Sequence, residues 1–176
     1  MKYLKFLNYF SDKAILRKIK KFLNEINDIS LGYGEINFIK FENLDKNQIG
    51  YKIDTNGNSL VTEVSGSWSN DWIVIGHDNM GDPIFIESYE EDLPIYTSEH
   101  GKEEWEVVLI AESLQKFKVI LQDLRTLSIG RENPVEIEEN PLNEKEIKSF
   151  TKKIKKENKE VDIWWWELFL DNNIDE

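Results

Sequence analysis

The stretch that decides the fold runs from Trp68 to Glu87 and reads Trp-Ser-Asn-Asp-Trp-Ile-Val-Ile-Gly-His-Asp-Asn-Met-Gly-Asp-Pro-Ile-Phe-Ile-Glu. Two short apolar runs, Ile73–Ile75 and Ile84–Ile86, bracket a loop rich in glycine, aspartate and asparagine. This pattern predicts a strand, a tight turn and a second strand. Acidic residues crowd the loop and the residues after it, without a recognisable catalytic set. The stretch therefore indicates a fold that displays acidic surface more than it indicates a reaction.

Further strands are expected on both sides of this hairpin. Residues 36–41 alternate between apolar and polar, and residues 49–53 and 60–64 flank Asn56-Gly57, the strongest short hairpin signal. Residues 105–109 are a further expected strand. Because parallel crossovers need a dozen or more residues, these short connections predict antiparallel pairing in a meander.

Helices are expected at both ends of the chain. Apolar residues between 15 and 26 recur at helical spacing, with Ser11 or Asp12 as the N-cap and basic residues on the other faces. That helix could lie on a membrane surface, but we favour packing on the core. A second helix is expected over residues 110–124. After a polar connector, a third should begin at Asn143, with Glu146 in capping-box position.

The last segment, residues 162–170, contains three consecutive tryptophans and is too apolar to remain in solvent. A short helix docked on the core is expected, and a homodimer or partner contact is the alternative. The chain is therefore predicted to be a single α+β domain, with an antiparallel, mostly meander sheet flanked by an N-terminal helix and C-terminal helices. Residues 1–126 should form its core, with the connector, helix and tryptophan-rich tail of residues 127–176 packed on it.

Size and charge restrict the function. The 176 residues suit one domain, and there is no cysteine for a disulfide or a thiolate zinc site. The absence of cysteine fits a reducing cytosol, and no apolar run approaches the ~20 residues that span a membrane, so a cytoplasmic protein is expected. The net charge of −12 opposes nucleic-acid binding and favours a basic protein partner, with simple solubility as the alternative.

The residue inventory gives little support to catalysis. There is no thiol nucleophile and no Gly-x-Ser-x-Gly elbow, and His77 and His100 belong to no zinc-binding motif. Asp78 and Asp82 suit either a turn or a magnesium site, and we favour the turn. A carboxylate pair for sugar hydrolysis, with Trp68 and Trp72 stacking on the sugar, is a further alternative. We expect no catalytic residue, no metal and no cofactor.

Several short motifs follow one another in a specific order. Trp72 and an apolar strand lead into Ile75-Gly76, Asp78 and Gly81-Asp82-Pro83, and a second apolar strand follows. The sequence continues through Pro94-Ile95-Tyr96-Thr97, His100-Gly101, Trp105 and the helix expected from Ile110. Together they resemble the central motif of the SUKH superfamily. The resemblance covers residues 50–124, whereas Leu31-Gly32-Tyr33-Gly34 departs from the N-terminal pattern of that superfamily.

The SUKH superfamily contains bacterial immunity proteins of polymorphic toxin systems and a fungal regulator of cell-wall synthesis. The resemblance implies an α+β protein that performs no catalysis and neutralises a cognate toxin, such as a nuclease, by direct contact. A regulatory scaffold that binds endogenous proteins in cell-wall or envelope control is the alternative.

Two sets of residues are singled out by this interpretation. Acidic residues of the expected loops are the candidates for partner contact, with solvated loop acids as the alternative: Asp78, Glu90, Glu91, Asp92, Glu103 and Glu104. The expected structural motif shapes the loop between the central strands and places two tryptophans in the core: Trp72, Gly76, Gly81, Asp82, Pro83 and Trp105.

Overall fold

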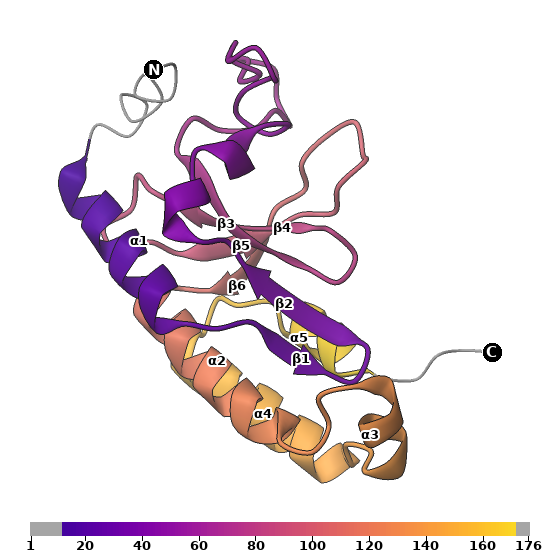
Figure 1. Cartoon of the computed structure of the whole chain (residues 1–176). Coiled ribbons are helices and arrows are strands. Elements are labelled where there is room, and N and C mark those ends of the chain that lie inside the picture. The colour runs from indigo at the N-terminus through magenta and orange to yellow at the C-terminus, as the bar shows by residue number, and fades with distance from the viewer. Residues whose placement is uncertain (1–11, 172–176) are drawn as a thin grey trace.

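The computed structural model describes residues 12–171, which form one six-stranded sheet and five α-helices. The strands are β1 (Ile29–Leu31), β2 (Gly34–Phe38), β3 (Trp72–Asp78), β4 (Pro83–Glu87), β5 (Ile95–Thr97) and β6 (Val108–Ala111). Their order in the sheet is their order in the sequence, and every neighbouring pair is antiparallel. The predicted α+β domain with a meander sheet is thereby confirmed (Figure 1).

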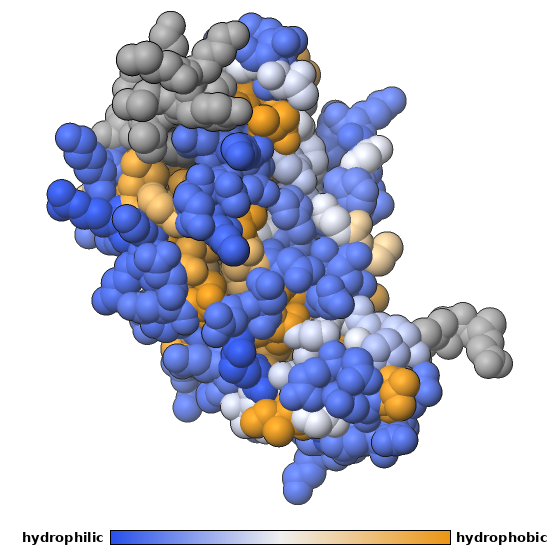
Figure 2. Space-filling view, viewed as in Figure 1, coloured by the Kyte–Doolittle hydropathy of each residue, from blue (hydrophilic) through white to orange (hydrophobic). Residues whose placement is uncertain are grey.

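Helices cover one face of the sheet. They are α1 (Lys13–Glu25), α2 (Leu114–Ser128), α3 (Pro134–Glu139), α4 (Glu144–Glu157) and α5 (Ile163–Leu170). In Figure 1, α1, α2 and α4 lie along one side of the molecule. The main core joins helix residues such as Phe22, Phe117 and Trp166 to strand residues such as Ile75 and Ile84. Figure 2 shows mostly hydrophilic side chains on the viewed surface, with apolar surface between them.

Two helices begin at the residues that the sequence predicts. The carboxylate of Asp12 accepts the N–H of Ala14 at 2.7 Å and caps α1, whereas Ser11 lies outside the described residues. Asn143 caps α4, and Glu146 completes the capping box by accepting the backbone N–H of Asn143 at 3.0 Å. In both cases a local polar side chain satisfies helix N–H groups that have no intrahelical partner.

The boundary between the last strand and α2 differs from the prediction. The strand occupies residues 108–111 and the helix residues 114–128, each later than expected. The N–H of Trp105 donates to the carbonyl of Gly66 at 2.8 Å, which ties the residues before β6 to another loop. Ser113 then caps the helix by accepting the N–H of Lys116 at 3.0 Å.

The segment between β2 and β3, residues 39–71, does not form the expected hairpin of strands. Its turn is present, since the N–H of Asp54 donates to the carbonyl of Asn58 at 2.8 Å. The residues on either side form only isolated bridges. The turn signal of the sequence was therefore right and the two flanking strands were wrong.

Gln48 fastens this segment to β3. Its side chain is only 2% exposed, and its Nε2 donates to the carbonyls of Val74 at 3.0 Å and Leu44 at 2.9 Å. Its Oε1 accepts the N–H of Val74 at 3.0 Å. Since β2 pairs with β3 only between Gly76 and Asp78, the amide satisfies both backbone groups of Val74 in place of a neighbouring strand.

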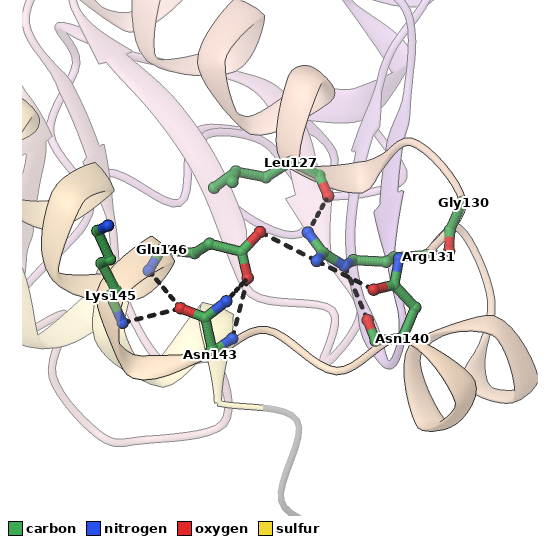
Figure 3. Close-up of polar contacts among 7 residues, drawn as sticks. All are labelled: Leu127, Gly130, Arg131, Asn140, Asn143, Lys145 and Glu146. Carbon is green, nitrogen blue, oxygen red and sulfur yellow. Dashed lines mark hydrogen bonds and ion pairs between the residues drawn. The ribbon is translucent and has the colours of Figure 1, made fainter.

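The connector after α2 contains the short helix α3, which the polar sequence did not predict. Pro134 stands in its first turn, where the missing N–H of proline costs nothing. Arg131 holds the connector together, because its guanidinium donates to the carbonyls of Asn140 at 2.8 Å and Leu127 at 3.1 Å. It also pairs with Glu146 of α4 at 3.0 Å (Figure 3).

The tryptophan-rich tail forms α5 and docks on the core, as predicted. Trp166 is fully buried, and its indole N–H donates to the carbonyl of Ile110 in β6 at 3.0 Å. Trp164 and Leu168 remain 47% and 63% exposed and are the large apolar side chains that α5 presents at the surface. Within residues 12–171, no helix has the length and apolar composition needed to cross a membrane.

Candidate partner-binding face

Aromatic side chains gather on the face of the sheet opposite the helices. Strand residues alternate between the two faces, so Val74 and Phe85 point away from the main core while Ile73, Ile75 and Ile84 enter it. We define the aromatic face by six residues that surround Val74: Tyr51, Trp68, Trp72, Phe85, Tyr96 and Trp105. Three come from strands β3, β4 and β5, two from residues 39–71 and one from the loop between β5 and β6.

The aromatic face has a buried floor and a partly exposed rim. Phe85 and Trp68 are 0% and 2% exposed, with ring centroids 4.9 Å apart. Trp72 and Tyr96 are half-buried, and their ring centroids lie 4.9 Å and 6.0 Å from that of Phe85. Half-exposed tryptophan and tyrosine rings on a rigid apolar floor are the composition that protein interfaces favour.

The whole net charge of the chain lies in the segment that builds this face. Residues 49–112 contain fourteen acidic and two basic residues, a net charge of −12. The remaining residues contain twenty acidic and twenty basic residues and are therefore neutral overall. The strands β3–β6 and their loops are thus strongly acidic, whereas the rest of the chain is balanced.

Two carboxylates lie beside the exposed rings of the aromatic face. Glu87 stands directly opposite Trp72 in the sheet and accepts its indole N–H at 2.8 Å. The pKa of Tyr96 is raised, mainly by burial and further by the charges of Glu90 and Glu87. In the described part of the chain, neither Glu87 nor Glu90 forms an ion pair.

The helices show the opposite pattern. Lysines of α2 and α4 pair with acids on the same or a neighbouring helix, among them Lys118 with Glu25 at 2.5 Å and Lys153 with Asp123 at 2.6 Å. Such exposed pairs contribute little stability, but they neutralise the helical surface. The helical surface is therefore largely balanced in charge, whereas Glu87 and Glu90 take part in none of the ion pairs of the described residues.

The turn between β3 and β4 is built by Asp78, one of the predicted contact residues. Its carboxylate accepts the N–H groups of Met80 and Asp82, both at 2.9 Å. Gly81 has a φ of 87°, a conformation that favours glycine. Burial raises the pKa of Asp78 despite these hydrogen bonds. The geometry gives Asp78 the role of shaping the turn, as the glycine-rich and aspartate-rich sequence suggested.

The other predicted contact residues do not gather at one place. Successive connections of a meander alternate between the two ends of the sheet, so the β3–β4 and β5–β6 loops share one end and the β4–β5 loop lies at the other. Asp78, Glu103 and Glu104 belong to the first end, and residues 90–92 to the second. The side chain of Glu104 is packed against Gly66. A single partner surface confined to one end of the sheet would contact only part of the predicted set.

Residues 90–92 are themselves divided between two surroundings. Glu90 influences Tyr96 of the aromatic face. Glu91 and Asp92 instead line a cleft of about 290 Å³ between α1 and the start of α2. The backbone carbonyls of the same two residues accept the ammonium of Lys18 and the N–H of Leu114, both at 3.1 Å. Glu90 is therefore the member of this trio that belongs to the aromatic face.

The predicted structural motif is positioned by contacts that the sequence did not reveal. Gly76 lies within β3 rather than in the loop, and a Cβ there would stand 2.7 Å from the carbonyl of Asn37 in β2. Pro83 is the first residue of β4. Trp72 and Trp105, expected in the main core, are half-buried in the second cluster on the opposite face.

Glu87 and Tyr96 belong to the acidic and aromatic residues that the sequence offers as recognition surface, but the predicted contact set does not include them. Glu87 stands opposite Trp72 because the register shifts between Val74 and Gly76, whereas regular counting outward from the turn would pair it with Ile73. Tyr96 faces the same side because it pairs with Phe85 in the next strand. The alternation of side chains along β4 was the available signal.

The two histidines each contact a polar side chain of another segment. His100 contacts the carboxylate of Asp82 through Nδ1 at 2.6 Å, which joins the β5–β6 loop to the β3–β4 turn. Among the described residues, no hydroxyl bonds its other ring nitrogen. His77 hydrogen-bonds the hydroxyl of Tyr51 at 3.2 Å, and burial lowers its pKa. Residues 12–171 contain no group of three or more acidic or histidine side chains suited to a metal ion.

Comparisons with family models, with curated proteins and with solved structures find no match to this chain.

Proposed function

We propose that this chain is a binding protein without catalytic activity, which neutralises a cognate protein toxin by direct contact. The observation that carries the proposal is the coincidence of two features, since residues 49–112 hold the whole net charge of −12 and also supply the aromatic face. The resemblance of residues 50–124 to SUKH immunity proteins supplies the class of partner.

The physical argument concerns what such a surface can bind. Unpaired carboxylates beside half-exposed rings attract a basic surface and give it aromatic area to pack against. Nuclease toxins are suitable partners, because enzymes that bind phosphate backbones carry clustered positive charge. By covering the basic surface of the toxin, the chain would prevent nucleic acid from binding there. The nucleic acid would also be repelled by the negative charge of the chain.

The test is a rescue assay with the toxin encoded beside the gene for this chain. We expect co-expression to restore growth, and the purified proteins to form a complex in a pull-down. The charge-reversed variant Glu87→Lys with Glu90→Lys should lose rescue. Glu139→Lys with Glu167→Lys makes the same change in charge at exposed residues of α3 and α5, and it should retain rescue.

Two results would contradict the proposal. Absence of both binding and rescue would reject the toxin as the partner and favour the regulatory scaffold, to be pursued by an unbiased partner search. Equal loss of rescue in the two charge-reversed variants would show that net charge alone, and not the aromatic face, determines binding.

A further inference from the structure

The chain contains a single Asn-Gly pair, Asn56-Gly57, and the structure places it in the turn of residues 54–58. Asn56 is exposed and Gly57 is half-exposed, so water has access to both residues. Gly57 has a φ of 86° and no side chain to shield its backbone nitrogen. The pair therefore combines an accessible side-chain amide with an unhindered backbone nitrogen directly after it.

These two groups can react with each other. The backbone nitrogen of Gly57 attacks the side-chain carbonyl carbon of Asn56, and the new bond closes a succinimide ring. The side-chain nitrogen leaves as ammonia and takes up the proton that the backbone nitrogen gives up. Water then opens the ring at either carbonyl and leaves aspartate or isoaspartate. The whole reaction consumes one water and releases one ammonia, without oxidation or reduction.

Asp54 opposes this reaction by holding the turn closed. Its Oδ1 accepts the N–H groups of Asn56 and Asn58, both at 2.8 Å, and its Oδ2 accepts the side-chain amide of Asn58 at 2.8 Å. The backbone carbonyl of Asp54 accepts the N–H of Gly57 at 3.0 Å. The attacking nitrogen is therefore held by a hydrogen bond, which must break before this nitrogen can reach the side chain of Asn56.

The turn can open without unfolding the domain. The hydrogen bonds that Asp54 makes in it join residues no more than four apart, and they lie at the exposed surface. The residues on either side form only isolated bridges, so no strand of the sheet depends on the turn. Exposed local hydrogen bonds open far more often than a buried core does. The reaction therefore needs only a local opening of residues 54–58.

We propose that Asn56 is a site of spontaneous deamidation and that Asp54 sets its rate by keeping the turn closed. The product adds one negative charge to the −12 of residues 49–112. Isoaspartate also lengthens the main chain by one carbon atom and disturbs the turn. The proposal concerns the chain alone and is independent of the toxin.

Peptide mass spectrometry of the full chain, incubated in mildly alkaline buffer, tests the proposal. We expect the peptide that contains Asn56 to gain the mass difference between an amide and a carboxylic acid, and to separate into aspartate and isoaspartate forms. Gly57→Ala should slow the reaction by about tenfold, because a Cβ hinders the approach of the nitrogen. Asn58 and Asn79 are internal controls, since Ser59 and Met80 follow them and they should react more slowly.

Matched variants test the role of Asp54. Asp54→Ala removes three hydrogen bonds of the turn and should accelerate deamidation of Asn56 by about fivefold. Glu63→Ala removes the same charge from an exposed position of residues 39–71 and should leave the rate within about twofold. The wild-type chain in urea provides a second measurement if Asp54→Ala does not fold, and it should deamidate faster than the folded chain.

Several outcomes would overturn the inference. An unmodified Asn56, or faster deamidation of Asn58 or Asn79, would reject the site. Equal rates in Asp54→Ala and the wild type, equal acceleration by Asp54→Ala and Glu63→Ala, or equal rates in the folded and urea-unfolded chains would reject the control by the turn.

Discussion

Replacing Gln48 by alanine should detach residues 39–71 from the edge of β3. The substitution removes three hydrogen bonds, two to the backbone groups of Val74 and one to the carbonyl of Leu44. Each is worth about 1 kcal/mol, and a buried backbone group left without a partner costs about 1–3 kcal/mol more. We expect the free energy of unfolding to fall by about 3–5 kcal/mol, a large part of the ~5–15 kcal/mol that stabilises a typical domain.

Urea unfolding monitored by tryptophan fluorescence measures this loss. With a slope of about 2 kcal/mol/M, the midpoint should move down by about 1.5–2.5 M. The matched control is Asn47→Ala, since the neighbouring amide donates a single hydrogen bond, to the carbonyl of Asn43 at 2.9 Å, and is only half-buried. Its cost should be about 1 kcal/mol or less.

The Gln48→Glu variant separates hydrogen bonding from volume. A carboxylate keeps the shape and can accept the N–H of Val74, but it has no donor for the two carbonyls. The variant should be at least as unstable as Gln48→Ala at neutral pH and should recover as the pH is lowered, because a protonated glutamate regains a donor. A loss below about 1 kcal/mol in Gln48→Ala would refute the role assigned to this amide.

Three further predictions concern other parts of the fold. Arg131→Lys should lower the free energy of unfolding by about 2 kcal/mol, because a single ammonium cannot contact Glu146 and the neighbouring carbonyls at the same time as the planar guanidinium does. Thermal unfolding would measure this loss, and an unchanged midpoint would reject the prediction. Gly76→Ala should lower the free energy of unfolding by at least about 2 kcal/mol, since the new methyl would overlap the carbonyl of Asn37. Chemical unfolding of the wild-type and variant chains measures this loss, and equal midpoints would reject the prediction. Burial lowers the pKa of His77 below its ordinary 6.5, so the unfolded chain binds the proton more readily and stability should fall as the pH drops through 6.5 towards the lower folded value. His77→Gln should reduce that dependence between pH 5 and pH 7.5, and an equally steep dependence in this variant would contradict the assignment.

The sequence predicted elements whose causes are local. The β3–β4 turn follows from Gly81 and the aspartates around it, and α4 from Asn143 and Glu146 a few residues apart. Residues 39–71 could not be placed in the same way, because the partner of Gln48 lies 26 residues further on. The turn at residues 54–58 was found, but its expected strands had no neighbouring strand to complete them.

The candidate site was predicted by charge, and only in part. Counting acidic residues placed Glu90 beside Glu91 and Asp92, although the fold directs them to different surroundings. Glu87 could be recognised only through its place opposite Trp72, which requires the register of two strands. The acidic residues can be counted in the sequence, but which of them share a surface depends on how the strands are paired.

The meander order has a consequence for how the chain folds. Four of the five strand pairs join neighbours separated by short loops, so their closure costs little conformational entropy. The pairing of β2 with β3 must instead close a loop of residues 39–71, which makes it the least local step in building the sheet. The contact of Gln48 with Val74 divides the loop of residues 39–71 into two shorter loops, one on each side of Gln48. We therefore expect β3–β6 to assemble early and the β1–β2 hairpin to join them late, with Gln48 governing the rate at which it joins.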